Sequence, residues 1–208
     1  MNLCSLPRLG RLDEYAPRPM QGAYRISGAP HHDLVESFVA APGPAGWRYF
    51  GRARDADTGE ELFKVDYIVD AGWDLIRFRA IYGGGLEVVV VPVPFGLEVS
   101  IGQPGEERTQ EFAGVSAVWS LSPCSLLVVD RRLRASGQDE LVAVRIKPSG
   151  EPEAVTVRLN RRGSQAIPTP AGGATSERVD VIVDGWRTKA LIRPDLPLSA
   201  EGWFELLG

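Results

Sequence analysis

The main pattern along the chain is an alternation of apolar and polar residues in short runs. The run "LFKVDYIV" places Phe63, Val65 and Tyr67 on one face of a strand and Lys64 and Asp66 on the other. Similar runs recur, among them "WRYFGRAR", "ELVAVRIK" and "ERVDVIV", and turn-forming segments such as "PGPAG" and "GGG" separate them. The pattern predicts about ten antiparallel strands joined mostly by short turns.

One segment departs from this alternation. "WSLSPCSLLVVDRRLRASG" predicts a helix with Ser122 as its N-cap, Pro123 at its first position and Gly137 near its C-terminal stop. Several arginines fall in its last turns, where the helix dipole favours cations. We therefore expect a single helix in the middle of a β protein.

The order of these elements restricts the fold class. Strands do not alternate with helices, which argues against a parallel sheet. A β-sandwich and a curved sheet remain, and near-consecutive hairpins favour the latter. We expect a mainly β fold in which a large curved antiparallel sheet, or incomplete β-barrel, wraps around one α-helix and leaves an apolar cavity. Residues 31–208 would form a single β-barrel domain, and the proline-containing residues 1–30 would form an N-terminal arm. Within the domain, the Pro/Gly-rich residues 167–174 predict a loop.

Two hairpins share a sequence pattern. "DYIVDAGWDLIRF" (66–78) and "DVIVDGWRTKALIR" (180–193) both run through Ile-Val-Asp to a Gly-Trp step. We expect Gly72 and Gly185 to supply the positive φ of a tight turn, and Trp73 and Trp186 to begin the return strand. Because Asp-Gly turns are common in β proteins, convergence on the same turn sequence also explains the repeat.

These hairpins and the helix together resemble a glycolipid-binding family whose members share an open β-barrel with the lipoprotein-carrier proteins. The resemblance covers roughly residues 50–190 and departs from the family pattern at Trp119 and its neighbours, where the family has an acidic residue. It implies an incomplete barrel around a helix with a lipid-like ligand. The positions that match are Tyr67, Asp70, Trp73, Ser122-Pro123, Arg131-Arg132-Leu133 and Asp184-Gly185.

Composition excludes several classes of partner. Hydrophobic residues make up 44% of the chain and charged residues 24%, which is typical of a globular protein, and the net charge of −4 gives no reason to expect nucleic acid. No run approaches the ~20 apolar residues of a transmembrane segment, and no signal-peptide core is apparent, so we expect a cytoplasmic protein. The sequence leaves open whether the protein forms a homodimer.

The sequence predicts neither a metal site nor a cofactor. Cys4 and Cys124 have no metal-binding spacing, and Cys124 is expected to be a free buried thiol. His31 and His32 are adjacent, so on a strand they would point to opposite faces and not share a metal. Phosphate-binding loops, dinucleotide fingerprints and nucleophile elbows are missing from the sequence.

The leading hypothesis is binding of an apolar or amphipathic small molecule, lipid-like in character, in the barrel cavity. Core packing is the competing interpretation of the aromatic residues among the candidates. The candidate ligand-binding residues are Tyr67, Trp73, Phe78, Tyr82, Trp119 and Arg132.

Two alternatives belong to other classes. One is an enzyme of secondary metabolism, a small-molecule cyclase or isomerase that uses the same cavity, with Asp66, Asp70, Arg77 and Tyr82 as catalytic candidates. If Asp66, Arg77 and Arg79 face water instead of the lumen, they form cross-strand pairs worth about 0.2–1 kcal/mol. The other alternative is a protein-interaction module that uses an exposed edge strand.

Overall fold

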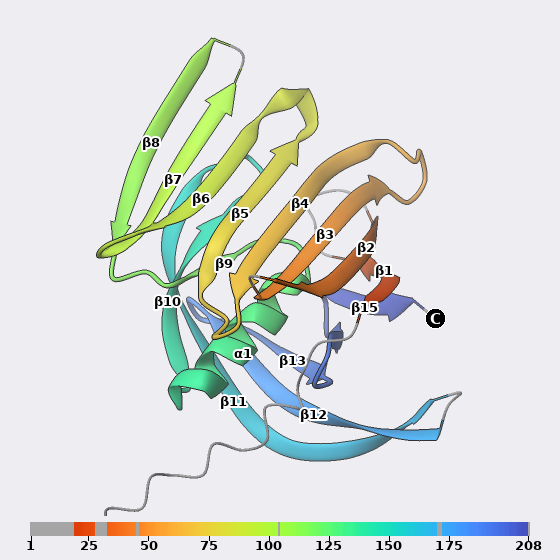
Figure 1. Ribbon diagram of the computed structural model, residues 1–208. Coiled ribbons are helices and arrows are strands. Elements are labelled where there is room, and N and C mark those ends of the chain that lie inside the picture. Colours follow the sequence, from red (N-terminus) through yellow and green to blue (C-terminus); the bar gives the residue numbers. More distant parts are fainter. Residues whose placement is uncertain (1–18, 28–32, 45, 104, 170–171, 208) are drawn as a thin grey trace, which may run out of the picture.

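The computed structural model describes residues 19–27, 33–44, 46–103, 105–169 and 172–207, which form strands, one α-helix and a short 3-10 turn (Figure 1). The first half contains β1 (Met20–Ile26), β2 (Leu34–Gly43), β3 (Gly46–Asp55), β4 (Glu61–Asp70), β5 (Leu75–Tyr82), η2 (Gly83–Gly85), β6 (Glu87–Val93), β7 (Gly96–Gln103) and β8 (Glu106–Ala113). The second half contains β9 (Ala117–Trp119), α1 (Cys124–Ser136), β10 (Glu140–Ile146), β11 (Pro152–Thr169), β12 (Gly172–Val183), β13 (Trp186–Ile192), β14 (Pro197–Ala200) and β15 (Phe204–Leu207).

All of these strands belong to one sheet, whose order is β8-β7-β6-β5-β4-β3-β2-β1-β15-β14-β13-β12-β11-β10-β9. Neighbours are antiparallel except β9 and β10, which are parallel and are connected through α1. The meander closes where β1 pairs with β15, and it stays open between β8 and β9. Figure 1 shows this sheet curving around α1. The mainly β fold with a curved sheet around one helix is therefore confirmed, and the sandwich alternative is wrong.

One free edge of the sheet is polar. Residues 106–111 of β8 are exposed and include three glutamates and an arginine. Charged side chains on an edge strand discourage pairing with another chain. Arg108 forms an ion pair with Glu151 in the turn after β10, so side chains connect β8 to the far side of the opening.

The other free edge, β9, is capped by a side chain. The backbone of Val118 is not bonded to a further strand, and the hydroxyl of Tyr67 takes the place of that strand. This hydroxyl donates to the Val118 carbonyl oxygen at 3.3 Å and accepts from the Val118 N–H at 3.1 Å. Both residues are fully buried. A tyrosine from β4 thus satisfies an edge that water cannot reach.

Replacing Tyr67 with phenylalanine tests this cap. We expect the free energy of unfolding to fall by about 3 kcal/mol, because two buried backbone groups of Val118 lose their partner. Urea denaturation followed by fluorescence measures the change. Tyr82→Phe is the matched control, since the Tyr82 hydroxyl has no hydrogen bond to the described part of the chain. Equal losses in the two variants would contradict the role of the Tyr67 hydroxyl.

The helix begins one residue later than predicted. Pro123 is the N-cap, Cys124 is the first helical residue, and Ser122 makes no capping bond because its hydroxyl donates to Glu36 instead. The predicted stop is confirmed: Gly137 adopts a left-handed conformation with a φ of 66°. Cys124 is a free buried thiol, as expected. Among the described residues, no helix is both long enough and apolar enough to cross a membrane.

The two similar hairpins contain different turns. Asp184 and Gly185 form a two-residue turn with φ of 46° and 85°, and Trp186 begins β13 as predicted. In the first hairpin the positive φ belongs to Trp73, at 67°, and not to Gly72, so that expectation is wrong. Trp73 therefore lies in the turn, because β5 begins only at Leu75.

Two predicted boundaries also change. Residues 20–26 fall in the segment predicted as an N-terminal arm, but they form β1 and pair with both β2 and β15. The loop expected at 167–174 is wrong over most of its length, because the ladder of β11 and β12 continues to the pair formed by Thr169 and Gly172. Cys4, His31 and His32 lie outside the described residues.

Candidate functional site

Three tryptophans surround a pocket of about 380 Å³ where β9, β10 and β13 meet the turn before β15. Trp119 is the last residue of β9, Trp186 the first residue of β13, and Trp203 lies between β14 and β15. We call this space the tryptophan pocket. Its size falls within the range of small-molecule sites, ~300–1,000 Å³.

The indole rings form a continuous wall. The Trp203 ring centroid lies 5.1 Å from that of Trp119 and 6.0 Å from that of Trp186. The Trp203 indole N–H donates to the Leu121 carbonyl oxygen at 3.0 Å, which fixes the orientation of the central ring. Trp186 is 45% exposed, whereas Trp119 and Trp203 are each 6% exposed. The wall is thus anchored at its central ring, buried at Trp119 and open to solvent at Trp186.

Charged residues follow the same edge of the pocket. In the sheet register Arg145 pairs with Trp119 on one side and Glu153 on the other, so these three side chains share a face. Glu153 forms ion pairs with Arg145 and with Lys147, the latter at 2.8 Å. Hydrogen bonds from Lys147 and Arg145 lower the pKa of the Glu153 carboxyl. The edge therefore carries two cations and one anion.

A buried carboxyl group lies inside the sheet next to the start of α1. Glu36 on β2 has no exposed surface, and its Oε1 accepts hydrogen bonds from the Tyr49 hydroxyl at 2.8 Å and the Ser122 hydroxyl at 2.6 Å. Its Oε2 has no hydrogen-bond partner among the described residues. Burial raises the pKa of this carboxyl to about 7, although the two hydrogen bonds act in the opposite direction.

Gly51 on β3 makes room for this group. A Cβ at Gly51 would lie 2.1 Å from Glu36 Oε1 and 2.9 Å from the Tyr49 ring. The neighbouring thiol and phenol are neutral near pH 7, because burial and the adjacent Glu36 raise the pKa of both Cys124 and Tyr49. The cluster of Glu36, Tyr49, Ser122 and Cys124 is closed to solvent.

One short segment joins the buried cluster to the pocket. Ser120 and Leu121 line the tryptophan pocket, and the hydroxyl of the next residue, Ser122, donates a hydrogen bond to the Glu36 carboxyl. The Ser120 and Ser125 hydroxyls are 2.8 Å apart, which ties this segment to the first turn of α1.

Of the six ligand-binding candidates, Trp119 lines the tryptophan pocket. Tyr67 and Phe78 have no exposed surface and pack edge-to-face at 5.3 Å, as core residues do. Tyr82 packs against Phe63 at 6.1 Å.

The two remaining candidates lie near the C-terminal part of α1. The Trp73 ring contacts the Trp47 ring at 5.4 Å, and the Arg131 guanidinium lies 6.0 Å from the Trp73 ring centre. Arg132 forms an ion pair with Asp74 at 2.6 Å, so its charge is engaged in the turn between β4 and β5.

The four catalytic candidates are not gathered in one cavity. Asp66 is held between Arg48 at 2.7 Å and Arg77 at 2.9 Å, on the face of β4 opposite Tyr67. Both arginine side chains are about half exposed, which places this cluster on the outer face of the sheet. Asp70 Oδ1 accepts the backbone N–H groups of Gly72 and Asp74 and so organises the turn.

The functional candidates that the sequence analysis missed are Trp203, Glu36 and the charged residues of the pocket edge, Arg145, Lys147 and Glu153, while Trp186 was noted only for its turn. Trp203 lies in "SAEGWFELLG", where a tryptophan that directly follows the turn-forming Glu201-Gly202 step was the available signal. Glu36 alternates with Leu34 and Phe38, so the strand period placed a carboxyl on an apolar face.

The comparisons with known proteins support the fold alone. No protein-family model matches the chain, so the resemblance to the glycolipid-binding family is not confirmed, and no curated protein matches it. Among solved structures, the chain is similar to a β-barrel-like protein of domain of unknown function DUF1849 from Brucella abortus. The two chains are 13% identical, with a TM-score of 0.56 over 93% of this chain and 97% of the other. This chain therefore has a β-barrel-like fold.

Proposed function

We propose that the protein binds an apolar or amphipathic small molecule, lipid-like in its apolar part, in the tryptophan pocket. The observation that carries this proposal is the indole wall around an open space of about 380 Å³. Aromatic side chains contribute large apolar contact areas at small entropic cost, and pockets of this kind are typical of small-molecule sites.

The sequence analysis expected the ligand in the cavity of the barrel, whereas the tryptophan pocket lies where β9, β10 and β13 meet the turn before β15. The interior between sheet and helix contains fully buried side chains such as Tyr67, Phe78 and Leu126. Asp66, Asp70, Arg77 and Tyr82, the candidates for a cyclase or isomerase, do not line the tryptophan pocket. Binding is thus the function that this geometry supports best.

A neutral fluorescent probe, N-phenyl-1-naphthylamine, tests the proposal. We expect the Trp186→Ala variant to bind the probe about tenfold more weakly than the natural chain, because loss of one aromatic contact costs about 1.4 kcal/mol. Fluorescence titration at fixed pH and salt gives the dissociation constants.

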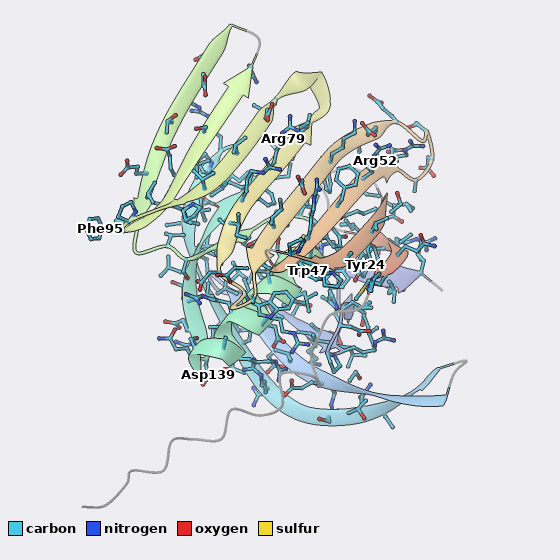
Figure 2. The ribbon with its side chains drawn as sticks, in the orientation of Figure 1. Tyr24, Trp47, Arg52, Arg79, Phe95 and Asp139 are labelled. Atoms are coloured by element: carbon cyan, nitrogen blue, oxygen red, sulfur yellow. The ribbon has the colours of Figure 1, made fainter. Side chains whose placement is uncertain are left out.

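Phe95→Ala is the matched control, since it also removes one aromatic ring. Phe95 is 86% exposed in the turn between β6 and β7, and it points away from the rest of the structure (Figure 2). Equal affinity in the natural chain and in Trp186→Ala, or an equal loss in Phe95→Ala, would overturn the proposed site.

A further inference from the structure

We propose that the tryptophan pocket selects amphipathic anions, in which an apolar body lies against the indoles and one carboxylate, sulfonate or phosphate group contacts Arg145 and Lys147. This inference rests on the proposed function and adds the charge of the ligand. It also assigns Glu153 a role in specificity.

The placement of the cations carries the first step. Arg145 stands in register beside Trp119, so a ligand that covers the Trp119 ring at the pocket brings its polar end next to the guanidinium. The Arg145 side chain is 35% exposed and that of Lys147 is 45% exposed, so both can exchange partners without unfolding the strand. A guanidinium group matches the geometry of a carboxylate or sulfonate and donates two hydrogen bonds to it.

The charge balance carries the second step. Arg145, Lys147 and Glu153 are the charged residues that line the pocket in the described part of the chain, and together they leave one positive charge. A ligand with one negative charge completes this balance, whereas a cationic amphiphile meets two like charges at the rim.

Glu153 carries the third step. Its carboxylate forms ion pairs with both Arg145 and Lys147, so a ligand anion must compete with Glu153 for these two cations. The same carboxylate therefore limits the affinity for anions and keeps the two cations oriented when no ligand is bound. Removal of its charge should strengthen anion binding. Misfolding would expose apolar surface and strengthen the binding of anionic and neutral naphthyl probes alike, so the gain must be confined to the anionic probe.

Two probes with similar naphthyl bodies separate charge from apolar contact. The anionic probe is 1-anilinonaphthalene-8-sulfonate, and the neutral probe is N-phenyl-1-naphthylamine. We expect Arg145→Gln to weaken the anionic probe about fivefold and Glu153→Gln to strengthen it about threefold, with the neutral probe unchanged in both variants. Fluorescence titrations of both probes on each variant measure these ratios.

The control and the contrary outcomes distinguish this inference from the proposed function. Arg79→Gln removes the same charge on β5, at a position outside the pocket, and should leave both probes unaffected. If the charge variants change both probes equally, or neither, while Trp186→Ala still weakens the neutral probe, the preference for anions is wrong and the binding site stands. If Trp186→Ala leaves both probes unaffected, the proposed function itself fails.

Discussion

Replacing Glu36 with glutamine is expected to make the protein about 3 kcal/mol more stable than the natural chain at pH 8 and to leave the two nearly equally stable near pH 4.5. The natural carboxyl is fully buried and its pKa is raised from 4.5 to about 7. The folded state therefore holds the proton more tightly than the unfolded state. Stability is fully present below pH 4.5 and is lost as the pH rises through 7, by about 3 kcal/mol in all.

The glutamine variant removes this loss because its amide does not ionise. Its carbonyl oxygen can accept the hydrogen bonds that Tyr49 and Ser122 donate, so the packing at Gly51 is retained. Urea unfolding of both proteins between pH 4.5 and pH 8 gives the difference between them, in which the other titrating groups cancel. Glu98→Gln, at a partly exposed position on β7, controls for the removal of a carboxylate in general. Parallel pH profiles for the natural chain and Glu36→Gln would show that Glu36 is not the group responsible.

Replacing Asp130 with asparagine is expected to lower the free energy of unfolding by about 3 kcal/mol. The Asp130 side chain is 1% exposed and accepts hydrogen bonds from Arg134 at 2.8 Å and Arg161 at 2.9 Å, which joins α1 to β11. Loss of its charge leaves two partly buried arginines without their central acceptor, and breaking such a buried pair costs several kcal/mol.

Glu140→Gln provides the comparison for Asp130. Glu140 also pairs with an arginine, Arg158, but both side chains are about half exposed, so we expect a loss below about 1 kcal/mol. Urea denaturation at pH 7 measures both variants. A loss in Asp130→Asn as small as that in Glu140→Gln would contradict the importance of the link between helix and sheet.

The fold class was predictable because it depends on periodicity. Alternating runs define strands, and one segment without alternation, with a glycine at its end, defines the helix. Turn geometry was less predictable, because the Asp-Gly-Trp similarity concealed different numbers of residues between the strands. Two residues separate β12 from β13, whereas four separate β4 from β5, and the strained φ moved to Trp73.

The site was less predictable than the fold because it is assembled from distant turns. Trp119, Trp186 and Trp203 are brought together by the order of the strands β9 to β15, which local patterns do not specify. Aromatic residues with a clean strand alternation, such as Tyr67 and Phe78, were attractive ligand candidates for the same reason that they are core residues. Glu36 was hidden because both faces of β2 contain apolar residues: Leu34 and Phe38 share a face with Glu36, and Val35 and Val39 lie on the other face, so alternation does not say which face is buried.

The pairing of β1 with β15 has a consequence for the order of events during synthesis. The strands β1 to β8 can assemble by local hairpins, but the free side of β1 must wait for residues 204–207, which follow it far along the sequence. Contacts this distant in sequence form late, since a long intervening chain must first be ordered. Until the ribosome has released those residues, β1 presents an unpaired strand that a nascent neighbour or a chaperone can reach.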